Sequence, residues 1–141
     1  MKYLAILFLL VAVVGCSVKP QPIIFGKDAC VFCKMNIVDK QHAAELVTNK
    51  GKVFKYDAIE CLLKDTERNK EDEVSLYLVV DYLNPEGFID ATKATYLVSE
   101  AIPSPMGAYL SAFTEQSKTK DFVKTEEDKV YIGSEIQQEI Q

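Results

Sequence analysis

The sequence predicts an α+β domain in which two ββαβ units pack together, with mostly antiparallel sheets. A pattern of strand, strand, helix and strand occurs twice, over about residues 43–83 and 88–133, although the two copies share no residue-by-residue repeat. The chain has 141 residues, and the part that follows an N-terminal export signal is long enough for one compact domain.

A β-hairpin and the start of a helix define the first unit. Residues 43–48 and 53–56 are short apolar stretches on either side of residues 49–52, whose sequence Asn-Lys-Gly-Lys favours a turn. Asp57 then has the position of a helix cap, and Glu60 follows at the spacing of a capping box. The pattern therefore predicts a hairpin followed directly by a capped helix.

The helix and the strand after it supply the apolar side chains of the first unit. Ile59, Leu62 and Leu63 have the i, i+3, i+4 spacing of one helical face, which we expect to face the core. Residues 74–82 are rich in Val, Leu and Tyr and form the strongest predicted strand, which we expect to be well buried. The sequence Asn-Pro-Glu-Gly at residues 84–87 predicts a turn after that strand.

The second unit repeats this order of elements. We predict extended segments at residues 88–89, 95–99 and 109–113, a helix over about 115–125, and a last strand at 130–132. Phe122 and Val123 supply the apolar side of the predicted helix. The polar residues 134–141, which follow Gly133, predict a flexible tail.

The first 26 residues predict a leader and a tether rather than part of the domain. Residues 1–15 have one lysine and an apolar run too short to span a bilayer, as in a signal peptide. Cys16 follows Val-Val-Gly, which is similar to the bacterial lipobox, in which the cysteine is acylated and becomes the mature N-terminus. Residues 16–26 contain two prolines and no periodicity, and they predict a tether to a folded domain at 27–133.

These features predict a membrane-anchored lipoprotein on the periplasmic side. Ser17 stands in place of the Asp that often retains lipoproteins in an inner membrane, so we expect the outer membrane. Removal of Lys2 with the leader takes the formal charge from −5 to −6. Because phosphate binding needs a basic face, this acidic chain is not expected to bind nucleic acid.

Three cysteines remain once Cys16 is assigned to lipid, and two of them form a Cys-x-x-Cys motif. Cys30 and Cys33 have a spacing that lets both side chains converge on one metal ion, and Met35 follows two residues later. A thioether is a soft ligand that suits copper(I). Met106 lies in the loop-like sequence Pro-Ser-Pro-Met-Gly. We predict that the copper(I) ligands are Cys30, Cys33, Met35 and Met106.

Other interpretations of these residues stay open. Cys30 and Cys33 could instead form a disulfide or a redox pair in an oxidising compartment, which is the basis of a rival function as a thiol–disulfide oxidoreductase. A four-ligand zinc site would need Cys61 and His42, but no second ligand pair has the spacing of a zinc finger. We expect Cys61 to be a small buried hydrophobe, and the two methionines could also fill the core. His42 is equally compatible with a surface residue and with a ligand.

Several motifs, in order along the chain, resemble the NosL family. The sequence DACVFCKMNI at residues 28–37 is similar to the family's cysteine motif. Similar stretches follow at residues 43–44, 54–63, 81–82, 88–91, 96–98 and 105–107. The resemblance covers about residues 26–125, with Glu60 in place of an expected glycine and Tyr56 in place of phenylalanine.

The resemblance implies a copper(I) chaperone for the maturation of nitrous-oxide reductase, with two ββαβ units related to a domain of the organomercurial lyase. It implies as partners a copper ion, nitrous-oxide reductase with its maturation machinery, and the membrane that holds the lipid anchor. Catalysis is not expected, because a single histidine without a convincing partner gives no nucleophile–base pair. The rival oxidoreductase would usually place Cys-x-x-Cys at the start of a helix near a βαβ pattern, whereas here the motif precedes every predicted strand and helix.

Overall fold

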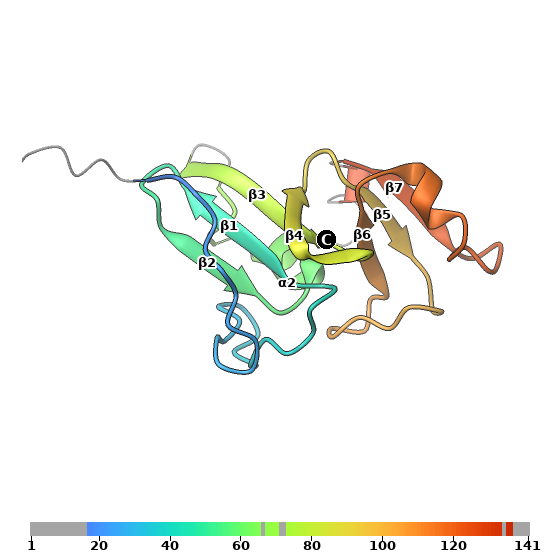
Figure 1. Cartoon of the computed structure of the whole chain (residues 1–141), viewed down its shortest axis with the longest axis horizontal. Coiled ribbons are helices and arrows are strands. Elements are labelled where there is room, and N and C mark those ends of the chain that lie inside the picture. The colour runs from blue at the N-terminus through green and yellow to red at the C-terminus, as the bar shows by residue number, and fades with distance from the viewer. Residues whose placement is uncertain (1–16, 66, 71–72, 134, 137–141) are drawn as a thin grey trace, which may run out of the picture.

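Two antiparallel sheets lie next to each other in the structure, a computed structural model that describes residues 17–65, 67–70, 73–133 and 135–136 (Figure 1). The larger sheet has four strands in the order β2-β1-β3-β4, and the smaller has three in the order β6-β5-β7. The short helix α2 contacts β1 and β2 of the larger sheet and β6 of the smaller one. This mixed architecture confirms the predicted α+β class.

The first unit has the predicted order of strand, strand, helix and strand. Its elements are β1 (Ala44–Thr48), β2 (Val53–Tyr56), α2 (Ile59–Lys64) and β3 (Val74–Asp81), and β4 (Asn84–Asp90) extends the sheet. Strand β1 pairs antiparallel with both β2 and β3. Gly51, with a φ of 78°, turns the chain between β1 and β2 in a conformation that costs glycine little.

The second unit has the same strand pairing. Its elements are β5 (Thr95–Val98), β6 (Leu110–Phe113), the 3-10 helix η2 (Gln116–Thr119) and β7 (Lys129–Ile132). Strand β5 pairs antiparallel with β6 and with β7, as β1 does with β2 and β3. The unit begins at β5 and not at residue 88, because Phe88 and Ile89 pair with β3 in the larger sheet.

The helix predicted over residues 115–125 is wrong beyond the single 3-10 turn of η2. Phe122 packs against Tyr82 and Phe113, with ring centroids 5.4 and 5.5 Å away. The Asp128 carboxylate accepts hydrogen bonds from two backbone amides of the same segment. Aromatic packing and these local hydrogen bonds outweigh a weak helical pattern, because short helices are only marginally stable by themselves.

The turn predicted at residues 84–87 lies earlier in the chain. Tyr82 and Leu83 form the turn between β3 and β4, and residues 84–87 belong to β4. The register of the pair shifts between Val80 and Asp81, so the turn-forming sequence is accommodated as an irregularity of an edge strand. Pro85 fits there because an edge strand or a bulge does not need its missing N–H.

The apolar face predicted for α2 is confirmed at Ile59 and Leu62, which are buried, whereas Leu63 is half-buried. Residues 74–81 form the predicted strand, β3, but the expectation that this strand is well buried is wrong, because within it only Val79 and Val80 are buried. The remaining β3 side chains are partly or fully exposed, as is common where one face of an antiparallel sheet is solvated.

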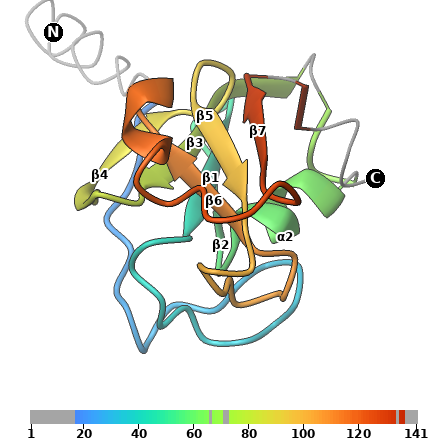
Figure 2. The same ribbon diagram turned by 90° about the vertical axis from the view of Figure 1, so that its right-hand side faces the viewer.

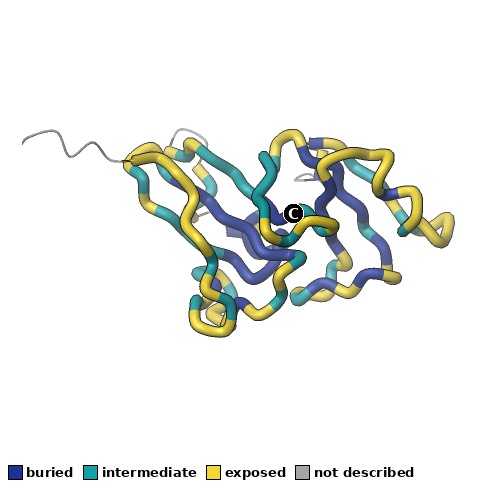
Figure 3. The backbone as a smooth tube through the Cα atoms, in the orientation of Figure 1, coloured by how far each residue is buried: buried dark blue, intermediate teal, exposed yellow. Residues whose placement is uncertain are grey.

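The main core lies where the two sheets meet, and buried residues from both contribute to it (Figure 3). Leu46 and Val79 come from the larger sheet, and Tyr96 and Leu110 come from the smaller one. A hydrogen bond of 2.8 Å from the Tyr82 amide to the Ala112 carbonyl also joins the sheets. The two units therefore share one core.

The folded part begins earlier than the predicted tether allows. Ile23 and Phe25 pack against the main core, and the Gln21 amide donates a hydrogen bond of 3.2 Å to the Glu45 carboxylate. The chain is thus attached to the sheet from about Gln21, which corrects the expectation of a free tether over residues 16–26. The apolar side chains at positions 23 and 25 outweigh the prolines beside them.

At the other end, the fold reaches past Gly133. Ile136 is buried in the main core, so the expectation of a flexible tail is wrong at this residue. The predicted leader (residues 1–15), Cys16, residue 134 and residues 137–141 lie outside the described part of the chain. Within the part that is described, no helix has the length and apolar character needed to cross a membrane.

Candidate metal centre

The Cys-x-x-Cys segment forms a tight loop ahead of β1. Ala29 and Asn36 form an isolated antiparallel bridge, and the Cys30 amide donates a hydrogen bond of 2.8 Å to the Met35 carbonyl. Lys34 closes the loop with a φ of 68°, and its amide donates to the Cys30 carbonyl at 3.0 Å. A left-handed conformation is unfavourable for lysine, so these hydrogen bonds hold the loop in shape.

The loop is fastened to strand β2. The Val31 amide donates a hydrogen bond of 3.0 Å to the Lys55 carbonyl, and the Lys55 ammonium lies 2.7 Å from the Asp28 carboxylate. The hydrogen bond from Lys55 holds the pKa of Asp28 below its ordinary value. Asp28, the first residue of the cysteine motif, therefore anchors the loop.

Helix α2 brings a third cysteine to this loop. The sulfur atoms of Cys30, Cys33 and Cys61 all lie within 4.8 Å of one another, and none of the three forms a disulfide. Cys30 and Cys61 are buried, whereas Cys33 is partly exposed. Cys61 is buried in the main core as expected, and its sulfur also lies beside the two sulfurs of the motif.

Cys30, Cys33 and Cys61 together form a group that we call the three-cysteine centre. This centre stabilises one negative charge. The thiol of Cys61 donates a hydrogen bond to Cys30, and the backbone amides of Asp57, Cys33 and Phe32 add to it, the Cys33 amide at 3.5 Å from the sulfur. Together they outweigh burial and lower the pKa of Cys30 to about 5. Cys30 is therefore a thiolate at neutral pH.

The other two cysteines keep their protons. The pKa of Cys61 is raised, first because its thiol donates to Cys30 and then because it is buried. Burial is the main cause of the raised pKa of Cys33, and the charge on Cys30 adds to it. The centre thus holds one thiolate and two thiols, a form in which a cation can replace protons.

The spacing of the sulfurs fits a soft metal ion. A thiolate lies about 2.3 Å from a bound zinc ion, so two sulfurs on one ion of that size are at most about 4.6 Å apart. The sulfurs of the three-cysteine centre already lie within 4.8 Å, so little movement is needed. A donor set of sulfur alone is soft and matches copper(I).

The two methionines are exposed, which makes the interpretation of them as core filler wrong. Met35 is 56% exposed and Met106 is 38% exposed. The loop of residues 28–39 and the loop of residues 99–109 lie at the same end of the molecule, the lower one in Figures 1 and 2. No contact among the residues that the structure describes joins either thioether to the three sulfurs, so the ligand role of Met35 and Met106 stays a prediction.

His42 has a structural place apart from the cysteines. It is buried, with Nδ1 3.0 Å from Asp39 Oδ1 and Nε2 3.1 Å from Ser111 Oγ. These contacts are those of a catalytic triad, but Ser111 is completely buried and no substrate can reach it. They tie the loop before β1 to β6, and the zinc site with Cys61 and His42 is wrong because His42 does not belong to the cysteine group.

The capping box that the sequence predicts from Asp57 and Glu60 is wrong, and both carboxylates are buried instead. The N-cap of α2 is Ala58, and no side chain caps the helix. Asp57 and Glu60 are instead 2% and 0% exposed, and burial raises the pKa of Asp57. The Glu60 carboxylate accepts a hydrogen bond from the hydroxyl of Ser104, which lies 44 residues later in the sequence. The sequence spacing carries no signal for that long-range contact.

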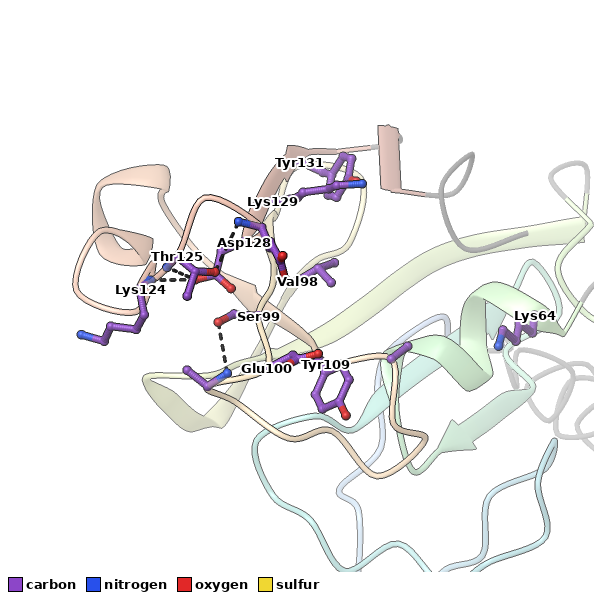
Figure 4. Close-up of a pocket in the computed structure, with 13 residues that line it drawn as sticks. Lys64, Val98, Ser99, Glu100, Tyr109, Lys124, Thr125, Asp128, Lys129 and Tyr131 are labelled. Atoms are coloured by element: carbon purple, nitrogen blue, oxygen red, sulfur yellow. Dashed lines mark hydrogen bonds between the residues drawn. The ribbon is translucent and has the colours of Figure 1, made fainter.

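A surface pocket of about 520 Å³ lies away from the cysteines (Figure 4). Its lining comes mainly from the second unit and mixes lysine with acidic residues, among them Lys124, Asp128 and Lys129. Asp128 is already engaged by backbone amides of its own segment. No cysteine or methionine lines the pocket, so it is separate from the metal centre.

The comparison with family models decides the relationship of this chain to known proteins. The model described as NosL matches residues 23–141. The chain belongs to the NosL family. The matched residues include the cysteine loop, α2 and the loop that carries Met106, so the NosL match confirms the resemblance that the ordered motifs suggested. A comparison with curated proteins gave no match.

A solved NosL structure has the same fold. The crystal structure of the copper chaperone NosL from Shewanella denitrificans matches with a TM-score of 0.69 and 24% sequence identity. The match covers 84% of this chain and 96% of that one. The similarity confirms the predicted fold class for nearly the whole described domain.

Proposed function

We propose that this NosL protein binds copper(I) outside the cytoplasm and delivers it for the maturation of nitrous-oxide reductase. The observation that carries the proposal is the three-cysteine centre, whose sulfurs lie within 4.8 Å of one another without a disulfide. Membership of the NosL family supports it, and the similar structure from Shewanella denitrificans is of a copper chaperone. A carrier needs no catalytic residues.

The proposed ligands divide into buried and exposed groups. The Cys30 thiolate supplies the charge that copper(I) needs, and the thiol of Cys33 offers a second sulfur at the partly exposed side. Met35 and Met106 add exposed thioethers, which are soft but uncharged. Cys61 lies close enough to serve as a further buried ligand.

This arrangement supports transfer of the ion rather than permanent storage. Copper(I) is stable with few soft ligands, so a ligand from a partner protein can add before one of the chaperone's own ligands leaves. The partly exposed Cys33 and the exposed Met35 give that incoming ligand access to the ion. The buried Cys30 keeps the ion attached until the partner's ligand has bound.

We further propose that a lipid on Cys16 anchors the mature protein to the outer membrane, on its periplasmic side. The domain is attached to its own sheet from about Gln21, so few free residues remain between lipid and fold. Five extended residues span at most about 18 Å. The copper site would therefore work close to the membrane surface.

Thiol–disulfide exchange is the second candidate function, and the lowered pKa of Cys30 favours it. The poor accessibility of the Cys30 sulfur argues against this second function. Cys30 is 1% exposed, so a disulfide in a substrate protein cannot approach the one sulfur that is a thiolate. The more accessible Cys33 has a raised pKa and is a poor nucleophile at neutral pH.

The experiment that tests delivery is a transfer assay. Copper(I)-loaded protein is mixed anaerobically with copper-free nitrous-oxide reductase, together with its maturation machinery, and the copper bound to the enzyme is measured. We expect transfer from the wild type and none from Cys30→Ser protein incubated with the same amount of copper. Loading of the enzyme at equal rates from free copper(I) and from the wild-type protein would contradict a delivery role.

A further inference from the structure

One buried hydrogen bond links helix α2, which carries Cys61, to the loop that carries Met106. The Ser104 hydroxyl donates to Oε1 of Glu60. Glu60 precedes Cys61 on helix α2, and Ser104 lies two residues before Met106. Glu60 is 0% exposed and Ser104 is 8% exposed, so water does not compete for this bond.

Burial of Glu60 needs a reason, because a buried carboxylate is costly unless it is hydrogen-bonded. The helix makes no use of it as a cap. Ser104 is the hydrogen-bond partner of Oε1, and Oε2 has no partner among the described atoms. The buried Glu60 side chain therefore holds Ser104 through this hydrogen bond.

Ser104 also organises the loop that displays Met106. Its hydroxyl accepts a hydrogen bond of 2.9 Å from the Tyr109 amide, and its carbonyl accepts one of 3.0 Å from the Gly107 amide. Gly107 and Tyr109 have φ angles of 73° and 58°, and this conformation is unfavourable for tyrosine. These two hydrogen bonds, which Ser104 accepts, keep the loop in this conformation.

The loop presents its methionine to solvent rather than to the core. Met106 is 38% exposed and belongs to neither buried cluster. Prolines on both sides of Ser104 restrict the backbone further. Among the residues that the structure describes, the bond between Ser104 and Glu60 is the side-chain hydrogen bond that ties this loop to α2.

We propose that Ser104 and Glu60 are positioning residues that hold the Met106 thioether at the rim of the three-cysteine centre. The inference rests on the proposed copper function, in which Met106 is a ligand. The hydrogen bond fixes the Met106 loop to the helix that carries Cys61, so the thioether is in place before copper arrives. Ligands held in advance lose less conformational entropy on binding and so bind more tightly.

The test compares copper(I) affinity and a signal from Met106 itself in the full-length, reduced protein. Affinity is measured by competition with a chelator, and the Met106 methyl group is followed by NMR after ¹³C-methyl labelling of methionine. Ser104→Ala should weaken copper(I) binding about 10- to 100-fold, the usual effect of removing a group that orients a metal ligand. The copper-induced shift of the Met106 methyl signal should be lost in this variant.

Three further variants separate positioning from general damage. Ser99→Ala removes another buried hydroxyl of the same loop, one that accepts a hydrogen bond from the Ala101 amide, and should keep the wild-type affinity. Met106→Leu should weaken binding, and the double variant Ser104→Ala/Met106→Leu should bind no more weakly than Met106→Leu alone. Glu60→Gln keeps an acceptor oxygen for Ser104 and should retain both affinity and the methyl shift, even if Ser104→Ala fails to fold.

The outcomes are distinguishable. Wild-type affinity with an intact methyl shift in Ser104→Ala overturns the positioning role, as does a large loss in Ser99→Ala. Wild-type affinity in Met106→Leu removes Met106 from the site and overturns this inference, while a cysteine-based copper function stands. Failure of the wild-type protein to bind copper(I) overturns the proposed function itself.

Discussion

The sulfur atoms of Cys61 and Cys30 lie within 4.8 Å of each other, although the β1–β2 hairpin separates the two residues in the chain. This contact joins helix α2 to the cysteine loop. It is also the largest cause of the lowered pKa of Cys30, so a residue outside the Cys-x-x-Cys motif controls the charge of that motif.

Replacement of Cys61 should therefore affect copper as well as stability. We expect Cys61→Ala to weaken copper(I) binding, because it removes a sulfur from the centre and a hydrogen-bond donor from Cys30. Cys61→Ser restores a donor but not a soft ligand, and so it separates the two effects. Chelator competition measures both, and unchanged affinity in the alanine variant would reduce Cys61 to a buried hydrophobe.

The depressed pKa of Cys30 predicts a pH-dependent stability of the reduced, metal-free protein. Folding lowers this pKa from 9.0 to about 5, so its stabilising contribution is fully present above pH 9 and is lost as the pH falls towards 5. The difference in free energy of unfolding between wild type and Cys30→Ser should shrink over that range. A difference that stays constant from about pH 9 to pH 5, measured by urea unfolding, would show that Cys30 is not the thiolate.

Packing of α2 predicts a contrast between neighbouring leucines. Leu62 is 2% exposed in the main core, so Leu62→Ala should lower the free energy of unfolding by about 2–5 kcal/mol. Leu63 is only half-buried, and Leu63→Ala should cost less. Equal costs in urea unfolding, or a larger cost at Leu63, would mean that the helix presents a different face.

The proposed lipid anchor is inferred from the sequence that precedes the described domain. Cys16→Ala should prevent acylation and release the protein from the membrane fraction, because the thiol that receives the lipid is gone. Mass spectrometry of the mature N-terminus and fractionation of cells check this outcome. An alanine variant that is acylated and processed like the wild type would exclude the anchor at this position.

The sequence predicted most strands because their apolar runs and turn residues are local features. The hairpin of β1 and β2, with its turn at Gly51, follows from two short apolar stretches and one glycine. The predicted helix at 115–125 failed because the position of Phe122 is set by contacts with Tyr82 and Phe113. Contacts of that kind depend on the tertiary structure and leave no periodic trace in the sequence.

Some residues of the candidate site can likewise be predicted from the local sequence, whereas others are brought there only by the tertiary structure. The pairing of Cys30 with Cys33 is visible in the sequence because short spacing alone brings the two side chains together. Cys61 has apolar neighbours that make it look like core filler, and only the return of α2 to the loop places it beside Cys30. The burial of Glu60 was likewise missed, because the capping-box pattern gave it a sufficient local explanation.

The most direct test of the copper(I) site is titration of the fully reduced protein with copper(I) against a competing chelator. We predict that the wild type removes copper(I) from the chelator and that Cys30→Ser and Cys33→Ser each bind it far more weakly, because each loses a cysteine sulfur ligand. Met35→Leu should show a smaller loss, since a thioether carries no charge. A wild-type protein that binds no copper(I), while Cys30 and Cys33 exchange readily with small disulfides, would contradict the copper function and establish the oxidoreductase in its place.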